Sequence, residues 1–487
     1  MDKPLSMIRA TVRLRPAIAM LACMLLFAAT GRTYGQSTAA PIDITVNSAV
    51  AQAIKQSSDV AGAVADWNSA RAKALAAELQ MLPSVSVSGS YTRLSQLPTS
   101  DTNLTLPLPA LVGGPVTVSL AGPQDAYSFG VSVRYPVFAG FRLMQAAKIA
   151  GLQTTGKELG IQIVRNALTF EVERTYWEAV RASANVTTML KNKDLVGVLL
   201  GQVKDQLDQG LATESDLLSA EESYNQAQIM LNDAISGRNQ AFLVLSSFLG
   251  QDKVGEELAG SGSGGFSADA VAAYVLSTDP AKSLFPELDG KLDPSKLVAE
   301  ALANRPEMQT AAVGLETARR AVAASQGALY PTLALIGDYS YANPNQRVLI
   351  ANGQFTGTWD VGVALSIDVG KLPANAAGAK AAGSDETRAQ AQTDAERSKI
   401  ILDVRKSLLA FEQARQDLAM TQSMVSQADE YLRVTQQKFD NGLAKHSDVL
   451  QAELAQLRAH FAVTNKQVDL QIASADLARA LGLGAAT

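Results

Sequence analysis

The sequence predicts a mainly α-helical fold with a smaller β portion, built as two tandem copies of one unit. The segment Leu207–Glu221 returns as Phe439–Glu453 at a constant offset of 232 residues. Prolines are absent between Pro136 and Pro280 and again after Pro373. Long helices need such tracts, because proline breaks a helix interior. Four short segments alternate between apolar and small polar residues, which is the pattern of β-strands.

Residues 1–35 have the composition of a secretory signal peptide. Basic residues precede the apolar run Ala17–Ala29, and small residues that suit cleavage follow it. We expect the cut after Gly35, with Gly31 as the alternative. A retained membrane anchor is the alternative to a cleaved signal, but the run is shorter than the roughly 20 residues of a membrane span. The single cysteine, Cys23, lies inside the run, and its lipidation is a further alternative.

The charge and the motifs narrow the function classes. The formal charge is −5, and it becomes −9 when residues 1–35 are left out, which argues against nucleic acid as a partner. The only histidines, His446 and His460, are fourteen residues apart on one predicted helix. That spacing is about 21 Å at 1.5 Å per residue, too far to share a metal ion. Phosphate loops, nucleophile elbows and Ser-His-Asp arrangements are absent. The sequence therefore predicts neither an enzyme nor a bound cofactor.

The alternating segments are Ser84–Thr92, Tyr127–Tyr135, Thr332–Tyr341 and Thr358–Ile367. Each has roughly the 9–11 residues of a membrane-crossing strand, with apolar side chains on one face. A soluble sandwich is the alternative. The smallest membrane barrels have about eight strands, so a barrel requires several chains. Arg134 lies on a polar strand face, which predicts a place in the barrel lumen, with an ordinary surface charge as the alternative.

The repeat extends over most of the chain. The offset of 232 runs from Gly130 and Gly362 to the end of the second unit, and upstream the offset is 248, as for Tyr91 and Tyr339. The two offsets differ by sixteen residues, and this change falls in the loops between paired strands, residues 93–126 and 342–357. Each unit is therefore expected to contain a helix, two strands, a long helix, a turn and a helix.

These boundaries divide the chain into four parts. After the signal, repeat 1 spans residues 36–250 and repeat 2 spans residues 294–487. Residues 251–293 contain a Gly- and Ser-rich stretch and are expected to form a mobile or partly helical linker.

The long helices carry a seven-residue period. In the second unit the same heptad position is occupied by Val404, Phe411, Leu418, Val425, Leu432 and Phe439. A sustained period of 3.5 residues makes packed helices supercoil in a left-handed sense. Residues 140–208 alone would form a rod of roughly 100 Å. The sequence thus predicts coiled-coil hairpins that turn at the repeated Gly-Leu step.

That step, Gly210-Leu211 and Gly442-Leu443, is typical of a helix end. We expect the glycine to adopt the left-handed conformation that ends one helix, and a capped helix to begin just beyond it. Asp216 and Asp448 then lie in a first helical turn, where the helix dipole favours an acid by about 0.3–1 kcal/mol. A purely structural role at the helix start is one interpretation of both.

In this order of elements the chain resembles the TolC family of outer-membrane efflux and secretion channels, over essentially its whole mature length. The matching motifs are Leu82–Val85 before the first strand, Tyr135–Gly140 after the second, Arg305–Met308 in the helix that opens the second unit, and both Gly-Leu tips. The resemblance implies a homotrimer in which three chains share a twelve-stranded barrel in the outer membrane and a long α-helical coiled-coil tunnel in the periplasm.

The resemblance also implies a function. The chain would be the exit duct of a tripartite efflux or type I secretion system, passing small molecules or proteins to the exterior. Its partners would be a periplasmic adaptor protein, an inner-membrane transporter and outer-membrane lipid. A secreted or periplasmic coiled-coil scaffold without channel activity is the alternative.

On the family's pattern the adaptor docks at the paired tips, which here are Gly210, Leu211, Gly442 and Leu443. The family's acidic tunnel constriction matches Asp448, with Asp216 as its counterpart in the first unit. This chain departs from the pattern of some members, because Gln451 stands where they have a second Asp, and Phe439 and Ala444 replace the Tyr and Arg that lock their closed gate.

Overall fold

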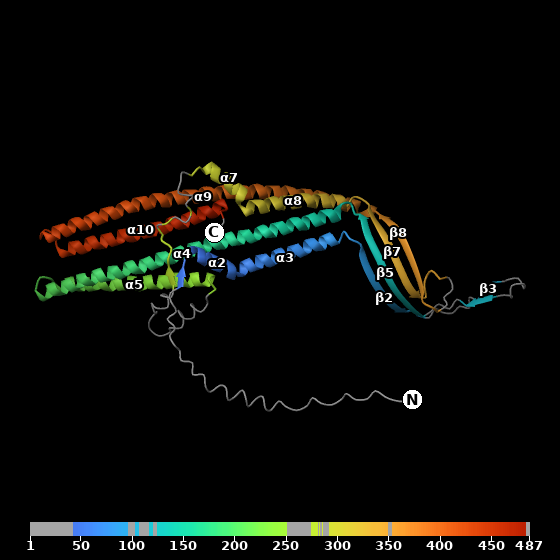
Figure 1. Cartoon of the computed structure of the whole chain (residues 1–487), viewed down its shortest axis with the longest axis horizontal. Helices are drawn as coiled ribbons and strands as arrows, with labels where there is room; N and C mark the ends of the chain where they lie inside the picture. The colour runs from blue at the N-terminus through green and yellow to red at the C-terminus, as the bar shows by residue number, and fades with distance from the viewer. Residues whose placement is uncertain are drawn as a thin grey trace, which may run out of the picture.

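The computed structural model describes residues 42–95, 103–106, 116–119, 124–250, 274–280, 282, 285, 292–348 and 353–483. Long helices run side by side over most of its length, and a bent four-stranded sheet extends from one end of them (Figure 1). The predicted signal and most of the predicted linker lie outside the described residues. Among the described helices, none is long and apolar enough to cross a membrane.

The two units have matching elements. The first contains β1 (Ile42–Ile44), α2 (Val46–Gln56), α3 (Ser58–Leu79), β2 (Ser84–Arg93), β5 (Asp125–Phe138), α4 (Arg142–Asp208) and α5 (Glu214–Phe248). The second contains α7 (Pro294–Asn304), α8 (Pro306–Gly327), β7 (Thr332–Asn343), β8 (Thr356–Ser366), a short 3-10 turn η4 (Val369–Lys371), α9 (Leu372–Asp440) and α10 (His446–Leu481). Helices α7 and α8 begin and end 248 residues after α2 and α3, as the sequence offset predicts.

Each unit opens with two helices, where the sequence predicted one. In the second unit the break falls at Arg305, because Pro306 lacks the N–H that a continuing helix needs and restricts the residue before it. In the first unit Ser57 ends α2 in an extended conformation, and its side chain accepts a hydrogen bond from the Val60 N–H to cap α3.

The long helices form as predicted. Helix α4 has 67 residues and α9 has 69, so each is about 100 Å long. The glycines inside α4 do not interrupt it. Along α9 the residues buried against its neighbours include Val404, Ser407, Phe411, Ala414, Thr421 and Thr435, which follow the predicted seven-residue period. Small side chains in this seam let the helix backbones approach closely.

The main sheet is antiparallel with the order β2-β5-β7-β8 (Figure 1). Strands β5 and β7, from different units, are its central pair, and β2 and β8 are its edges. At β2 and β8 the described residues provide no outer neighbour. The sheet therefore ends on both sides in backbone groups that can pair with another strand.

Two further strand pairs were not expected from the sequence. Strands β3 (Asn103–Leu106) and β4 (Val116–Ser119) pair inside the predicted loop 93–126. In the predicted linker, β6 (Tyr274–Leu276) pairs in parallel with β1. The described part of the linker thus contains a strand, and no helix is assigned there. Parallel pairing joins segments far apart in sequence, which local patterns do not reveal.

The core lies in the middle of the helices, where Leu276 and Phe285 of the predicted linker pack against it. One cluster surrounds Tyr176 and Trp177 of α4, and another surrounds Ile400 and Val404 of α9. The Tyr176 hydroxyl donates to the Ile44 carbonyl over 3.0 Å and lies 3.1 Å from the Thr278 hydroxyl. These contacts hold β1 and β6 against α4. The first cluster also includes Val468 of α10, so the two hairpins are joined at mid-length, away from the sheet and from the helical tips.

Candidate functional site: a two-faced sheet and paired helical tips

The two glycines of the repeated turn adopt the predicted conformation. Gly210 has a φ of 75° and Gly442 a φ of 72°, both left-handed. The Leu211 N–H donates to the Gln206 carbonyl over 2.8 Å, and the Leu443 N–H donates to the Lys438 carbonyl over 2.7 Å. A bond from the second residue past the helix end back to its third-last residue is the Schellman motif. The sequence prediction of a helix end at both places is confirmed.

The leucines that follow these glycines project from the helical tips. Leu211 is 75% exposed and Leu443 is 78% exposed. The α4–α5 tip and the α9–α10 tip lie at the same end of the molecule, opposite the sheet (Figure 1). The structure thus brings Gly210, Leu211, Gly442 and Leu443 together as two exposed apolar points on one end.

Asp216 and Asp448 have their carboxylates in hydrogen bonds at helix starts. Asp216 Oδ2 accepts from the Thr213 hydroxyl over 2.7 Å and from the Thr213 N–H over 2.8 Å. Hydrogen bonds from the Thr213 side chain and then its backbone hold the pKa of Asp216 below its usual range. Asp448 Oδ2 accepts from the Lys445 N–H over 2.9 Å. Both aspartates therefore stabilise the turn that precedes their helix. This agrees with the interpretation that gives them a structural role at the helix start.

The sheet has one apolar face. In the register of the four strands, Val87 lies opposite Val131, Val131 opposite Tyr339, and Tyr339 opposite Trp359. These side chains are exposed, and Trp359 is 71% exposed. Large apolar patches of this kind mark contact surfaces for lipid or protein. At the end of the sheet far from the helices, the rings of Tyr341 and Phe355 stack, and the ring pairs Tyr91–Tyr127 and Tyr127–Phe355 are in tilted contact.

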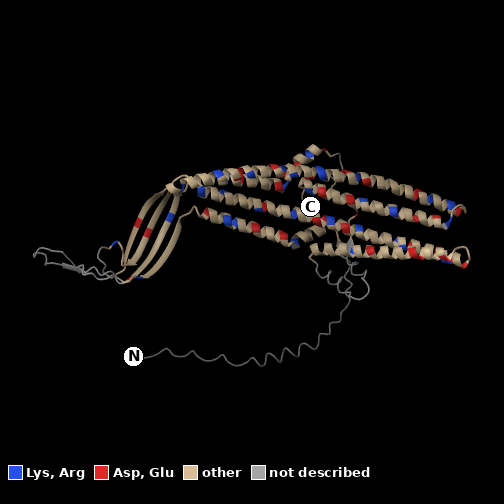
Figure 2. Cartoon of the chain, turned by 180° about the vertical axis from the view of Figure 1, so that it is seen from behind, with Lys and Arg blue, Asp and Glu red and all other residues tan. Residues whose placement is uncertain are grey.

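The opposite face carries small polar residues and a few charges. Arg134 lies there, between Ser84 and Ile336 in the register. Sequence analysis did not select Asp338 and Asp360, which face each other directly across β7 and β8 on this same face. Arg347 Nη2 contacts Asp360 Oδ1 at 2.7 Å. The sequence pattern could have identified Asp338 and Asp360, because both aspartates occupy polar positions of their alternating segments. Figure 2 shows that charges are scarce on the strands and spread along all the long helices.

Comparison with known proteins agrees with the two-faced sheet and the paired helical tips. The family model described as "Outer membrane efflux protein" matches residues 49–251 and 297–483, which together make up most of the chain. The chain belongs to the outer membrane efflux protein family. Outer membrane protein OprJ of Pseudomonas aeruginosa is 22% identical over 364 residues, covering 74% of this chain and 71% of OprJ.

Two solved structures show the same fold as this efflux protein. The CmeC outer membrane channel of Campylobacter jejuni superposes with a TM-score of 0.69 at 16% identity, covering 90% of this chain and 86% of CmeC. The open state of the MtrE outer membrane channel of Neisseria gonorrhoeae superposes with a TM-score of 0.67 at 17% identity, covering 90% and 89%. The predicted resemblance is confirmed, and family membership decides against an enzyme and against a scaffold without transport activity.

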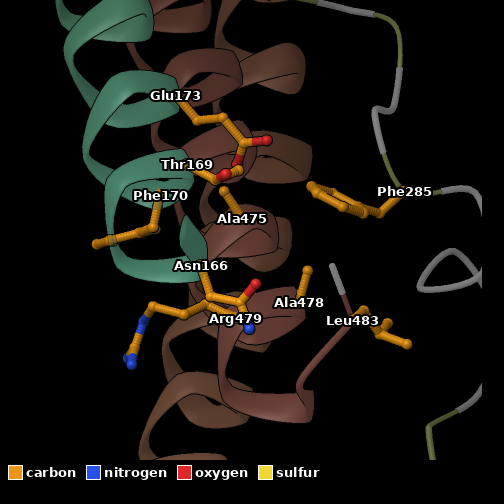
Figure 3. Close-up of a pocket in the computed structure, with 9 residues that line it drawn as sticks. All are labelled: Asn166, Thr169, Phe170, Glu173, Phe285, Ala475, Ala478, Arg479 and Leu483. Atoms are coloured by element: carbon orange, nitrogen blue, oxygen red, sulfur yellow. The ribbon is translucent and has the colours of Figure 1, made fainter. Parts of the chain in front are cut away.

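The efflux protein has a buried carboxylate that sequence analysis missed. Glu173 of α4 is 6% exposed and lines a cavity of about 10 Å³, room for roughly one water molecule. Figure 3 shows it beside Thr169 and Ala475, with Phe285 across the cavity. Burial raises the pKa of Glu173 to about 7. Its only sequence signal is its spacing from Thr169 and Tyr176, which places it on the buried stripe of α4.

A charged cluster joins the helices of the second unit. Arg305 is 5% exposed, and its guanidinium contacts Asp403 at 2.7 Å and Glu307 at 3.1 Å. Arg479 of α10 contacts Asp403 at 3.4 Å and lies 5.3 Å from the ring centre of Phe170 on α4. Burial would raise the pKa of Asp403, but its bonds with Arg305 and Arg479 outweigh burial and lower that pKa. Helices α4, α8, α9 and α10 therefore meet at one point.

The two hairpins diverge from the middle of the molecule toward the tips. Arg181 on α4 contacts Asp469 on α10 at 2.6 Å, and this ion pair crosses between the hairpins. Next to it a groove of about 600 Å³ lies between α4, α5 and α10, lined among others by Met189, Met230 and Phe461. The hairpins are thus held together near the core and separate at their ends (Figure 1).

Proposed function

We propose that this protein is the trimeric exit duct of a tripartite efflux system in the outer membrane. Three copies contribute four strands each to a twelve-stranded barrel, and their long helices form a tunnel into the periplasm. The observation that carries the proposal is the exposed apolar face of the sheet in a chain of this family. A strand with one face toward lipid and a small polar face toward water is what a membrane barrel requires.

The open edges of the sheet support several chains per barrel. A four-stranded sheet has too few strands to close, whereas about eight or more do close. Inside the hydrocarbon core an unpaired strand edge would leave backbone groups without hydrogen bonds, at a cost of several kcal/mol each. Closure by neighbouring copies removes every edge. Arg134, Asp338 and Asp360 would then lie in the lumen, because they share the polar face.

The tips are the entrance to this duct. The exposed Leu211 and Leu443, held by the left-handed Gly210 and Gly442, offer two rigid apolar contacts to a periplasmic adaptor protein. The adaptor would connect the duct to an inner-membrane transporter, which supplies the energy. The duct itself carries out no chemistry and passes cargo through a polar lumen.

Conductance tests the proposal. The purified protein in detergent, added to a planar lipid bilayer, should produce discrete current steps. In fractionated cells, the protein should be found in the outer membrane. A matched preparation denatured before addition should produce none. Recovery of the native protein as a monomer without detergent would contradict the proposal.

A gate at the tip predicts a second outcome. Replacing Asp448 by Ala removes the charge and the acceptor for the Lys445 N–H, whereas Asp448→Asn keeps an acceptor oxygen. If the carboxylate restricts the entrance, both variants should raise conductance or weaken block by cations. If Asp448 acts only as a cap, Asp448→Asn should conduct like the parent. Unchanged conductance and block in both variants would remove Asp448 from the gate.

A further inference from the structure

The groove between the two hairpins has the size of a ligand site. It has a volume of about 600 Å³ and lies beside the ion pair of Arg181 with Asp469. Its α4 wall runs from Glu178 to Met189, roughly 16 Å along the helix. Helices α4 and α5 of one hairpin and α10 of the other line it. Small-molecule sites in proteins commonly measure about 300–1,000 Å³, so the groove can hold a small organic molecule.

The two ends of the groove differ in polarity. Arg181 and Arg238 line the end near the core, and Met189 and Met230 follow eight residues, about 12 Å, nearer the tips on α4 and α5. Phe461 precedes the Arg181 contact of α10 by eight residues and lines the tip end as well. Methionine side chains are flexible and adapt to ligands of different shapes. The groove is thus cationic at one end and apolar at the other.

Arg238 is the cation of this groove that lacks an anionic partner. Arg181 contacts Asp469 at 2.6 Å and Glu178 at 3.6 Å. Among the ion pairs of the described residues, none includes Arg238, whose Nη2 lies 3.3 Å from Asn239 Oδ1. Its Nε is buried and has no hydrogen-bond partner there. Burial also lowers the pKa of Arg238. A partly dehydrated cation without a counter-charge is costly, and an anionic ligand would offset that cost.

The acidic residues of the groove do not neutralise Arg238. Glu178 is already paired with Arg181. Asp233 precedes Arg238 by five residues on α5, about 7.5 Å nearer the tips, and is exposed. Water and salt screen an exposed charge more strongly than a partly buried one. At the core end of the groove the charge of Arg238 therefore dominates.

We propose that this groove binds an amphiphilic organic anion, whose charged group contacts Arg238 and whose apolar part extends past Met189 toward Phe461. The site is built within a single chain, so this inference goes beyond the proposed duct and does not depend on it. The bound anion would contact α5 of one hairpin and α10 of the other, where the hairpins begin to separate. Binding would therefore hold the two hairpins together.

A pair of probes with opposite charges tests the selectivity. Octanoate is the anionic probe, and octyltrimethylammonium is its cationic counterpart with the same chain. Isothermal titration calorimetry of the purified full chain in maltoside detergent, corrected by titration into detergent alone, should show tighter binding of octanoate. Arg238→Gln should weaken octanoate binding about tenfold or more, because it removes a charge-assisted hydrogen bond. Arg174→Gln is the control, since Arg174 of α4 is 55% exposed and lies outside the groove.

A second variant tests the place of binding without touching a charge. A Cβ on Gly237 would meet no atom within 4 Å, so Gly237→Leu should fold and fill the groove with its side chain. That variant should lose binding of octanoate. Octanoate should also slow maleimide labelling of Met189→Cys several-fold and leave Leu190→Cys unchanged, because Leu190 is exposed beside the groove and does not line it. The parent, with Cys23 as its only cysteine, gives the background labelling.

The acidic residue gives the opposite test. Asp233→Asn removes a negative charge near the bound chain and should bind octanoate more tightly than the parent does. Equal affinities for the two probes would show that the groove is merely apolar, and weaker octanoate binding by Asp233→Asn would show that it prefers a cation. Either result, no binding by the parent, or unchanged binding by both Arg238→Gln and Gly237→Leu would overturn the proposal.

Discussion

Glu173 is a carboxylate in the packed interior of a helical bundle, and its chemistry follows from that position. Water is nearly excluded around it, so the charged form loses hydration. The pKa of Glu173 rises from 4.5 to about 7, and burial is the cause. The carboxyl is therefore mostly neutral in mildly acidic solution and becomes charged above neutral pH. A neutral carboxyl suits the apolar contacts that Phe170 and Phe285 make around this cavity.

This shift predicts a stability that depends on pH. Because the folded-state pKa lies above the unfolded value, the folded state is fully favoured below about pH 4.5 and loses stability as pH rises through about 7. The loss amounts to up to about 3 kcal/mol per chain. Glu173→Gln should remove it, so the variant should melt at a higher temperature than the parent at pH 8 and show a flatter change from pH 5 to pH 8.

Melting temperatures in detergent measure the difference. Glu171→Gln is the control, because Glu171 is on the same helix and its side chain is 50% exposed. That variant should keep the parent's pH profile. Parallel profiles for the parent and Glu173→Gln would show that Glu173 is hydrated in the assembled protein.

At the tips single residues also decide local structure. Gly210 and Gly442 occupy a left-handed conformation that other residues adopt at a cost of roughly 1–2 kcal/mol. Thr213 caps the helix after the first tip, whereas Lys445 stands at the corresponding place after the second. Among the contacts of the described residues, the Asp448 carboxylate accepts the Lys445 backbone N–H, whereas the Asp216 carboxylate accepts both the Thr213 backbone N–H and the Thr213 hydroxyl. The second tip is thus the less firmly capped of the two.

At the scale of elements the cluster around Arg305 fixes the helices of the second unit. Arg305 precedes α8, Asp403 lies on α9, and Arg479 lies on α10. Removing the buried guanidinium would take away the ion-pair partner of Glu307 and leave Asp403 with the Arg479 guanidinium at 3.4 Å. An unpaired, partly buried carboxylate is costly even where the intact ion pair contributes little net stability.

Arg305→Ala should therefore destabilise the protein by about 3 kcal/mol. Arg319→Ala is the matched control, because Arg319 is on α8, is 53% exposed and contacts Glu386 at 3.5 Å. An exposed pair of that kind contributes at most about 1 kcal/mol. Denaturant unfolding followed by circular dichroism compares the two. Equal losses in both variants would mean that the cluster does not anchor the helices.

The whole molecule separates two environments along its length. The sheet carries few charges and an exposed apolar face, whereas charged residues cover the helices from the sheet to the tips (Figure 2). The core and the ion pairs that hold the hairpins together lie between these ends. Such a molecule is suited to a position across one membrane with its helices in water.

Adjacent residues on β8 allow a direct test of this orientation. Val363 lies on the apolar face and is 68% exposed, while Ala364 lies on the opposite face. A lysine facing lipid near the middle of the membrane costs about 2–4 kcal/mol, whereas a lysine facing the lumen stays hydrated. Val363→Lys should reduce the amount of protein in the outer membrane, and Ala364→Lys should not. Immunoblots of membrane fractions measure both, and the reverse order would place lipid on the other face.

Much of this fold could be predicted from the sequence because its signals are local and repeated. The proline-free tracts, the seven-residue period and the alternating strands each reflect the geometry of one element. The Gly210 and Gly442 turns, confirmed in the structure, depend only on backbone sterics within a few residues. The repeat then fixed the order of elements in both units. Family membership, confirmed by comparison, followed from that order.

Tertiary structure decided what no local pattern encodes. The parallel pair of β1 and β6, the burial of Glu173 and the convergence of Arg305, Asp403 and Arg479 all join segments distant in the sequence. The register between β5 and β7 is also of this kind, since it forms between the two units. The sequence alone determined the long helices, the four long strands and their repetition, because short-range sterics and periodicity act along the chain. Only folding in three dimensions determined which residues lose water and which faces stay open for a second copy.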